Sequence, residues 1–236
     1  MNSLSRRLSR LGLVNVYLVS EEDGFTLIDA GLPDMAPAIL KAAHAAGQPI
    51  RRLLLTHAHA DHVGSLDDLK AALPDAEVLV GEGEAGNLAR SQVRTSPTRW
   101  LSDGDHVGHL RAIATPGHAP GHLAFLDERD GTLYAGDTFV NVLGLRVVSE
   151  LHPLFPMPTL ATPDPAQALA SARLLLDLPL RYLALGHGPE LRDPGAAMLR
   201  AVEQAGRALG APPSPLRLAL ARRVDGLFRA AGRQGS

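Results

Sequence analysis

Three histidines and an aspartate lie within six residues, in the segment THAHADH at residues 56–62. Imidazole and carboxylate groups are common ligands of zinc, iron and manganese. Residues 50–55 come directly before this segment, end in an apolar run, and are predicted to form a buried strand. Side chains at i and i+2 beyond a strand end point to one side, so His57 and His59 would face the same ion. Asp61 and His62 lie farther round the turn and are better placed to reach a second ion, so two metals are plausible.

Three further segments place a histidine or an aspartate after a predicted strand. They are TPGHAPGH at residues 115–122, LYAGDT at 133–138 and YLALGHG at 182–188. In the first of them, glycine and proline form a tight turn that presents a histidine from the end of a strand. Functional groups of open α/β sheets collect outside the strand ends, where these segments would meet THAHADH. The sequence therefore predicts one site built from several strand ends.

These segments resemble the motifs of the metallo-β-lactamase superfamily. With TLIDAG at residues 26–31 they make up five motifs in the order of that family, and the resemblance extends from about residue 15 to residue 188. It implies an α/β fold of the αββα sandwich type, in which helices flank two β-sheets. Within the superfamily, the chain is most similar to lactonase-like and glyoxalase II-like members.

The resemblance also implies which side chains bind metal. One ion would be held by His57, His59 and His118, the other by Asp61, His62 and His187, and Asp137 would bridge both. Asp29 would not bind metal but would brace the site, which suits the need of metal ligands for oriented hydrogen-bond partners. The expected cofactors are two divalent transition ions, with zinc expected first and iron or manganese as alternatives.

The remaining histidines are interpreted differently. His122 is left open between a ligand, a hydrogen-bond donor and a strand residue, because the resemblance favours His118 as the ligand of its motif. His44, His106 and His109 are predicted to be solvated surface residues. The run Asp-Gly-Asp at residues 103–105 is predicted to be a turn, because it lacks the further oxygen ligands of a calcium loop.

Composition agrees with one compact enzyme domain. The chain has 236 residues with a hydrophobic share of 45%, enough for a single α/β core. We expect residues 1–236 to form one domain, with 193–236 as its C-terminal helical extension. The net charge of -2, without blocks of like charge, argues against a nucleic-acid surface. The absence of cysteine excludes disulfides and thiolate ligands.

The sequence also bears on location and partners. No apolar run approaches the roughly 20 residues needed to span a bilayer, and the apolar stretch at residues 11–19 lacks a small-residue cleavage site. We therefore expect a cytoplasmic protein with a small-molecule substrate and no membrane partner. The oligomeric state is left open between monomer and homodimer.

The elements that would position the site follow from periodicity and turn residues. We expect strands at residues 15–20, 25–29, 50–55, 77–80, 104–114, 122–127, 132–135 and before His187. We expect helices at residues 35–46, 66–73, 82–90, 165–176, 194–209 and 216–231. Arg6, Arg7 and Arg10 are expected on a helical or terminal segment.

The predicted reaction is hydrolysis. Two adjacent cations would bind a bridging water and lower its pKa from about 15.7 towards about 7, so that hydroxide attacks a small ester, lactone or thioester. Asp61 would orient this nucleophile and carry a proton. The chain has no Gly-x-Ser-x-Gly elbow and no cysteine, which disfavours covalent catalysis. Phosphodiester hydrolysis on the same two ions and an iron-binding redox or sensor role are the alternatives.

Two stretches bear on the substrate. FVNV at residues 139–142 stands where glyoxalase II has a Gly-Cys-Gly-Arg glutathione-binding stretch. Residues 141–160 contain no confident helix or strand, and prolines would stiffen them into a loop. We expect this loop to wall the cleft, with Leu154, Phe155 and Met157 touching an apolar acyl group and His152 near its polar end. The alternative is a surface loop that packs on the core.

Overall fold

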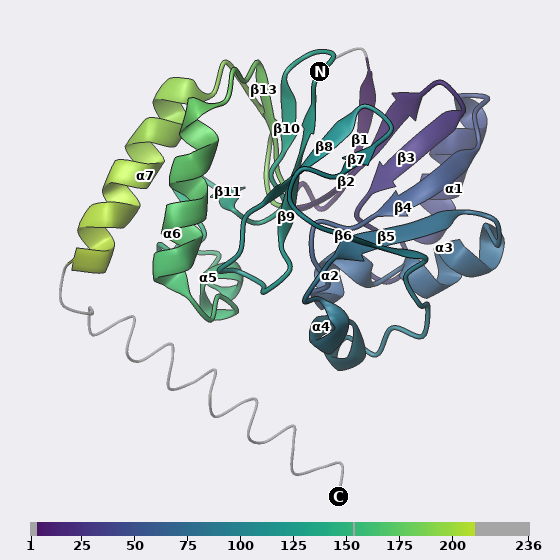
Figure 1. The fold of residues 1–236 in the computed structure, drawn as a ribbon, viewed down its shortest axis with the longest axis horizontal. Helices are drawn as coiled ribbons and strands as arrows, with labels where there is room; N and C mark the ends of the chain where they lie inside the picture. Colours follow the sequence, from purple (N-terminus) through teal and green to yellow (C-terminus); the bar gives the residue numbers. More distant parts are fainter. Residues whose placement is uncertain (1–3, 153, 211–236) are drawn as a thin grey trace, which may run out of the picture.

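The computed structural model describes residues 4–152 and 154–210 of the chain. These residues form four layers, in which helices cover the outer faces of two packed β-sheets. Figure 1 shows α1 and α3 on the right of the sheets and α6 and α7 on the left. The predicted αββα sandwich is confirmed.

The first sheet contains six strands among the described residues, arranged in sequence order. The first three are antiparallel, and pairing from β3 to β6 is parallel. The strands are β1 (Ser5–Arg10), β2 (Val14–Glu21), β3 (Gly24–Ile28), β4 (Ile50–Leu54), β5 (Glu77–Gly81) and β6 (Arg99–Leu101). The helices that follow β3, β4 and β5 are α1 (Ala36–Ala45), α2 (Ala60–Val63), α3 (Leu66–Ala72) and α4 (Ala85–Arg90).

The second sheet, over the same described residues, has the strand order β14-β13-β10-β9-β8-β7. Its strands are β7 (His106–Val107), β8 (Leu110–Ala114), β9 (Leu123–Asp127), β10 (Thr132–Tyr134), β13 (Tyr182–Ala184) and β14 (Leu191–Arg192). A separate hairpin of β11 (Phe139–Asn141) and β12 (Leu145–Val147) follows β10. The helices on this side are α5 (Met157–Leu160), α6 (Pro165–Leu174), which runs into a 3-10 turn at Leu175–Asp177, and α7 (Gly195–Gly210).

Alternation along the strands explains why the sheets stack. Successive side chains of a strand point to opposite faces. In β2, Val16 and Leu18 pack towards the helices α1 and α3, whereas Tyr17 and Val19 pack towards the second sheet. A third cluster lies between the second sheet and the helices α6 and α7. Both sheets are thus buried on both faces. This packing holds the sheets, and with them the ends of their strands, in fixed positions relative to each other.

The strand ends that carry the candidate ligands meet at one edge. The backbone N–H of Leu123, at the start of β9, donates to the Thr56 carbonyl just beyond β4 at 2.8 Å. The N–H of Ala135, after β10, donates to Ala184 at the end of β13, also at 2.8 Å. The first bond joins the segment before His57 to the segment after His122. The second joins the segment before Asp137 to the segment before His187. The backbone pairing of the fold therefore brings the motifs together.

Most predicted elements are confirmed, but the strand expected over 104–114 consists of two short antiparallel strands, β7 and β8, joined by a turn at Gly108. Two expectations in the N-terminal half are also wrong. The expectation of a helical or terminal segment for Arg6, Arg7 and Arg10 is wrong, because these residues form β1, an edge strand paired with β2. Charged side chains on an edge strand discourage pairing with other chains. The helix expected over 82–90 begins only at Ala85, since Glu82 bonds to Leu101 of β6 and Glu84 to Gly81 in a turn.

The stiff loop expected over residues 141–160 is also corrected. It contains β12, which pairs with β11, and the short helix α5. Pro156 is the residue before α5 and Pro158 lies in its first turn, where a missing N–H costs nothing. The prolines therefore start a helix here instead of stiffening a loop.

Two further expectations concern the ends of the molecule. The helix expected over 216–231 lies outside the described residues, and the single-domain organisation stays a prediction. In the part of the chain that the structure describes, no helix is both long enough and apolar enough to cross a bilayer.

Candidate metal centre

Three imidazole nitrogens converge beyond the ends of β4 and β8. His57 Nε2 lies 3.1 Å from His59 Nδ1, and His59 Nδ1 lies 3.0 Å from His118 Nε2. His57 and His118 are buried, and His59 is partly exposed. The structure thus brings together the three side chains predicted for the first metal.

A second group lies beside the first and contains two carboxylates. His187 Nε2 lies 3.3 Å from Asp61 Oδ2 and 3.1 Å from Asp137 Oδ2. His62 Nε2 lies 3.3 Å from Asp137 Oδ1, while Asp137 Oδ2 is 3.5 Å from His118 Nε2. Asp137 therefore faces both groups, which is the position that a bridging ligand requires; its assignment as the bridge stays a prediction.

Asp29 connects the two groups from behind. It follows β3 with a positive φ of 60°, an uncommon conformation for a residue other than glycine. Its Oδ1 accepts the backbone N–H of Thr56 at 2.8 Å, and its Oδ2 accepts His62 Nδ1–H at 2.8 Å. The Thr56 hydroxyl donates to Asp29 and can accept His57 Nδ1–H at 3.1 Å. Asp29 thus orients the candidate ligand His62 directly and His57 through Thr56; its bracing role stays a prediction.

The hydrogen bonds of the ring nitrogens indicate which nitrogen is free. His187 Nδ1 donates to the Leu13 carbonyl at 3.1 Å, and His118 Nδ1 donates to Thr162 Oγ1 at 2.8 Å. The Nδ1 bonds of these two rings and of His57 and His62 leave Nε2 of all four histidines facing the cluster, and a bound cation would require each Nε2 to be unprotonated. Thr162 was missed by sequence reasoning, because nothing in the sequence links it to a histidine 44 residues earlier.

His122 has both ring nitrogens occupied. Its Nδ1 pairs with Thr115 Oγ1 at 2.7 Å, and its Nε2 accepts the backbone N–H of Asp137 at 3.1 Å. Burial lowers its pKa to about 3, so the ring is neutral and can accept this bond. His122 therefore supports Asp137 as an acceptor, a role that was not among the three left open by the sequence.

Electrostatics divides the site into two halves. Burial lowers the pKa of His57 and His118 well below the usual value, so these imidazoles are neutral and need lose no proton to bind a cation. Burial also opposes charge at His187, but Asp137 and Asp61 outweigh it and raise the pKa of His187 to about 9. Burial raises the pKa of Asp61, yet the imidazoles of His62 and His187 bring it down to about 2. This half is therefore acidic and attracts positive charge.

Three features of the described residues fit a bound metal. The buried atoms His62 Nε2, His187 Nε2 and Asp137 Oδ1 make no hydrogen bond of acceptable geometry there. Three sets of donor atoms each lie within 4.8 Å of one another: His57, His59, His118; His57, His62, Asp137; and Asp61, His62, His187. A Cβ on Gly186 would come within 2.4 Å of Asp137 Oδ1, so only glycine leaves room for this carboxylate. Nitrogen and oxygen donors without thiolate suit zinc, iron or manganese.

A cavity of about 460 Å3 opens onto these donors. His59, Asp61, His118 and Asp137 form part of its lining. Its apolar lining comes from Val14, Leu32, Pro33 and Ala60 in the first half of the chain and from Phe155, Met157, Pro158 and Ala161 in the second. Candidate metal ligands in the lining of a largely apolar cavity are the arrangement expected for a small-molecule site.

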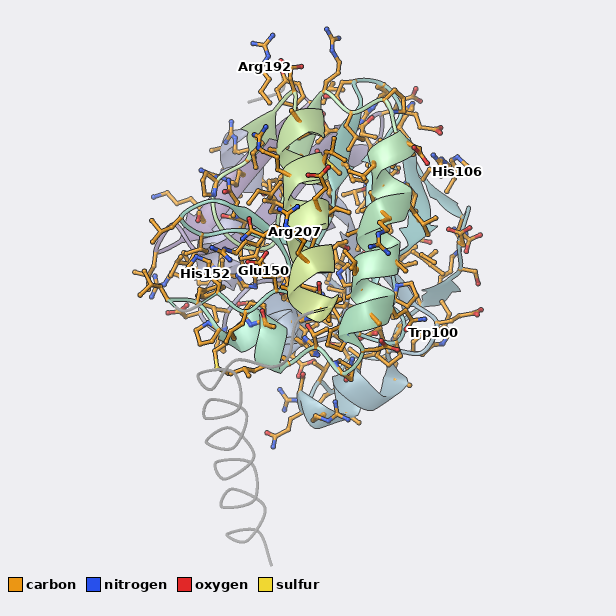
Figure 2. The ribbon with its side chains drawn as sticks, turned by 90° about the vertical axis from the view of Figure 1, so that its left-hand side faces the viewer. Trp100, His106, Glu150, His152, Arg192 and Arg207 are labelled. Carbon is orange, nitrogen blue, oxygen red and sulfur yellow. The ribbon has the colours of Figure 1, made fainter. Side chains whose placement is uncertain are left out.

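The four residues expected to contact substrate lie in different places. Phe155 and Met157 line the cavity, and the Phe155 ring lies 5.1 Å from the His187 ring. Leu154 is not among the lining residues and is 73% exposed. His152 is buried outside the lining, and its Nδ1 accepts the backbone N–H of Phe155 at 3.1 Å. Figure 2 shows His152 close to Glu150 on the side of α7, and Glu150 accepts a bond from Gln204 of α7 at 2.6 Å.

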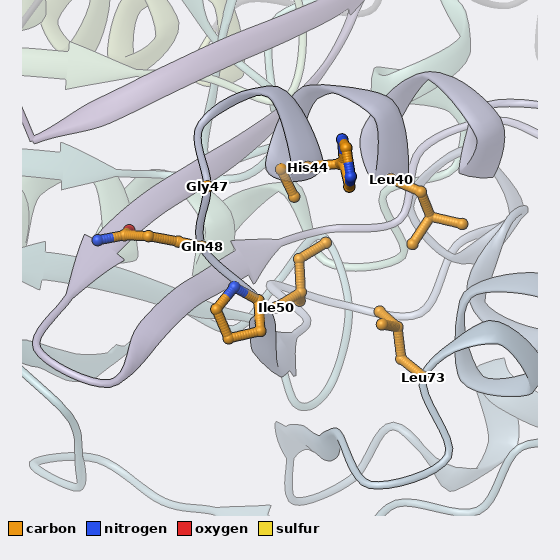
Figure 3. A pocket seen from close by; sticks show the side chains of 8 residues that line it. Leu40, His44, Gly47, Gln48, Ile50 and Leu73 are labelled. Carbon is orange, nitrogen blue, oxygen red and sulfur yellow. The ribbon is translucent and has the colours of Figure 1, made fainter.

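A second cavity has a lining that differs chemically from the candidate metal centre. It has a volume of about 580 Å3 and is lined by Leu40, His44, Ile50 and Leu73 together with the turn at Gly47 and Gln48 (Figure 3). It offers one imidazole and no carboxylate, so its lining cannot build a metal site. His44 and His106 are exposed, as predicted. His109 is only half-exposed and bonds to the buried Glu21 at 2.6 Å, which corrects the expectation of a purely solvated residue.

Comparison with known proteins identifies the family. The model of the family described as Metallo-beta-lactamase superfamily matches residues 9–187. The chain belongs to the metallo-β-lactamase superfamily. Together with the donor clusters, membership of this superfamily supports a metal-binding hydrolase and confirms the family predicted from the motifs.

Individual relatives agree with this assignment. Uncharacterized protein YobT of Bacillus subtilis (strain 168) is 41% identical over 210 residues, which cover 81% of this chain and 90% of YobT. A hydroxyacylglutathione hydrolase of Acidiphilium cryptum (strain JF-5) is 32% identical over 226 residues, covering 91% of this chain and 85% of that enzyme. Among solved structures, TTHA1623 in a di-iron-bound form matches with a TM-score of 0.64 and 28% identity, covering 80% of this chain and 93% of TTHA1623.

Proposed function

We propose that this metallo-hydrolase cleaves a small ester, lactone or thioester with an apolar acyl group, using two bound divalent ions. The observation that carries the proposal is the cavity of about 460 Å3, which has apolar walls and the predicted ligands of both ions in its lining. An acyl chain seated between Val14 and Phe155 would hold its carbonyl near Asp61 and Asp137. Zinc is the proposed metal, with iron or manganese as alternatives.

The two ions, when bound, would supply the Lewis acidity that activates water and polarises the scissile carbonyl. The chain's own part is to orient the reactants. With a pKa of about 2, Asp61 is ionised at neutral pH, and its side chain is 38% exposed at the cavity. Its carboxylate can accept a hydrogen bond from the attacking water and take up its proton. The lining contains no serine, threonine or cysteine among the described residues, which favours water as the nucleophile over a side-chain hydroxyl or thiol.

The charge of the cavity lining favours acyl substrates over phosphodiesters. Within the described residues, neither lysine nor arginine lines the cavity. Sites for phosphodiesters commonly use such cations to hold the phosphate oxygens. An uncharged acyl compound suits the walls better. The hydroxyacylglutathione hydrolase relative acts, by its name, on a thioester, which supports thioesters as the first class to try.

The partner proposed for this site is the small-molecule substrate itself. A panel of acyl esters, lactones, acyl thioesters and a chromogenic phosphodiester tests the proposal on full-length protein loaded with Zn²⁺, Fe²⁺ or Mn²⁺. We expect metal-dependent turnover of at least one acyl class, and loss of that turnover in Asp61→Asn. Phosphodiester turnover exceeding all acyl turnover, or oxygen-dependent turnover with iron alone, would replace this proposal by one of its alternatives.

A further inference from the structure

Glu84 is a buried carboxylate that the proposed reaction does not use. It is fully buried at the residue before α4, the short helix at the bottom of Figure 1. Isolated buried carboxylates are costly, so each needs partners that repay the loss of water. The partners of Glu84 lie on the two loops that supply the three-histidine cluster.

Each oxygen of Glu84 holds one of these loops. Oε2 accepts the backbone N–H of Ala58 at 2.9 Å, and Ala58 lies between His57 and His59. Oε1 accepts the backbone N–H of Gly121 at 2.7 Å, in the turn that also carries His118. Asn87 Nδ2 donates to Oε2 at 2.9 Å and fixes the carboxylate from its own helix. The three hydrogen bonds described for Glu84 all come from N–H groups, so both of its carboxylate oxygens act as acceptors.

The same helix also holds the other side of Ala58. The Ser91 hydroxyl, at the end of α4, donates to the Ala58 carbonyl at 2.8 Å. The peptide groups on both sides of Ala58 are therefore fixed by α4. At the second loop, a Cβ on Gly121 would come within 2.1 Å of the Glu82 carbonyl, so this turn packs directly against the segment that carries Glu84.

We propose that Glu84 is a positioning residue for one ion of the pair, the ion held by His57, His59 and His118. It ties the two loops that supply these ligands at a fixed separation. None of the bonds of Glu84 described above reaches the other cluster, in which His62 is held by Asp29 and His187 by the Leu13 carbonyl. Loss of Glu84 should therefore weaken the three-histidine ion and spare the other.

The substitution Glu84→Gln tests this with little change in shape. An amide has one acceptor oxygen and one NH2 group. If its oxygen takes the place of Oε2, the NH2 group faces the Gly121 N–H, and one tie is replaced by two opposed donors. Supporting groups of this kind typically change metal affinity by about 10- to 100-fold.

The measurement is Zn²⁺ titration of the full chain, by calorimetry against a competing chelator. Glu84→Gln is made in two backgrounds: His187→Ala, which keeps the three-histidine cluster, and His118→Ala, which keeps the other. We expect about a 10-fold or greater loss of Zn²⁺ affinity in the first background and a change of less than about twofold in the second. Equal losses in both, or no loss in the first, would overturn the proposal.

Glu21→Gln is the matched control. Glu21 is also a buried carboxylate surrounded by donors, but its partners are His109 and Arg129, away from both clusters. It should lower thermal stability without changing Zn²⁺ affinity, and a loss equal to that of Glu84→Gln would contradict a specific role. If Glu84→Gln does not fold, Asn87→Ala removes one donor and keeps both loop ties. A smaller loss confined to the same ion is then expected, and its absence overturns the proposal.

The role of Glu84 rests on the proposed metal centre, and different experimental results would refute the metal centre and the role of Glu84. If the wild-type protein and both background variants with Glu84 intact bind no Zn²⁺, the metal centre itself is wrong and this role of Glu84 falls with it. If wild-type protein binds Zn²⁺ but Glu84→Gln shows no selective loss, only the role of Glu84 is refuted.

Discussion

Replacing Thr162 by valine should weaken metal binding although Thr162 is not a ligand. The Thr162 hydroxyl accepts His118 Nδ1–H at 2.8 Å and donates to the Pro158 carbonyl at 2.8 Å. Thr162 is 7% exposed, so water cannot readily take its place. Valine has the same shape but leaves Nδ1–H of a buried ring without an acceptor.

The size of the effect follows from the lost bond. An unsatisfied buried donor costs about 1–3 kcal/mol, and about 1.4 kcal/mol corresponds to tenfold in an equilibrium constant. The penalty falls on the tautomer that presents Nε2 to the ion, so Zn²⁺ affinity at the three-histidine cluster should fall about 5- to 150-fold. Zn²⁺ titration against a chelator in the His187→Ala background measures it.

Thr162→Ser is the control, because serine keeps the hydroxyl and both hydrogen bonds. We expect its Zn²⁺ affinity to stay within about threefold of wild type, since only a methyl group is lost. Wild-type affinity in Thr162→Val would refute the argument that this bond sets the His118 tautomer. An equal loss in both variants would show that packing, and not the hydrogen bond, is responsible.

Three other predictions concern catalysis and metal removal. Asp61→Asn should lower kcat by about 100-fold or more, because the amide cannot take up a proton, while the melting temperature shifts by little; wild-type kcat at full metal content would exclude the role. Phe155→Ala should raise KM for substrates with long acyl chains by about tenfold. The control Leu154→Ala, at a residue outside the cavity lining, should leave KM unchanged. If KM in Phe155→Ala rises equally for short and long acyl chains, Phe155 does not contact the acyl group. Removal of metal by a chelator should lower the melting temperature, with recovery on adding Zn²⁺, because ligands that bind the native state stabilise it; an unchanged melting temperature measured by circular dichroism would contradict a metal centre.

The strand-end motifs were predictable because their signal is local. In THAHADH the ligand types and their spacing lie within one segment, and the preceding apolar run places them after a strand. The same holds for Asp137 and His187, each of which follows a short apolar strand and a glycine. The family resemblance then supplied a prediction that the spacing alone left open, namely which residues would share an ion.

The supports of the ligands were not predictable, because they are contacts between distant segments. Glu84 bonds to Ala58 across 26 residues, and Thr162 bonds to His118 across 44. A buried glutamate before a helix looks, in sequence, like any surface glutamate. The sequence also does not show which side chains of a segment point into a cavity. Leu154 and Phe155 are neighbours of similar hydrophobicity, yet of the two only Phe155 lines the cavity.

Neither sheet alone carries a complete set of donors, and this ties metal binding to the fold. His57 and His62 follow strand β4 of the first sheet, whereas Asp137 and His187 follow strands β10 and β13 of the second. The three-histidine cluster likewise takes two ligands from the first half and His118 from the second. An ion held between them would therefore stabilise the packing of the sheets as well as the site.

The Tyr17 hydroxyl donates to the Leu185 carbonyl at 2.8 Å, close to His187. This bond is a contact between the two sheets that needs no metal. Tyr17→Phe should thus lower the melting temperature at every Zn²⁺ concentration, while the free energy gained on adding Zn²⁺ stays as in the wild type, because a ligand that binds only the native state adds a free energy set by its concentration and affinity alone. A Zn²⁺ gain that differs between the two proteins in thermal titrations would show that this contact and the metal centre are coupled.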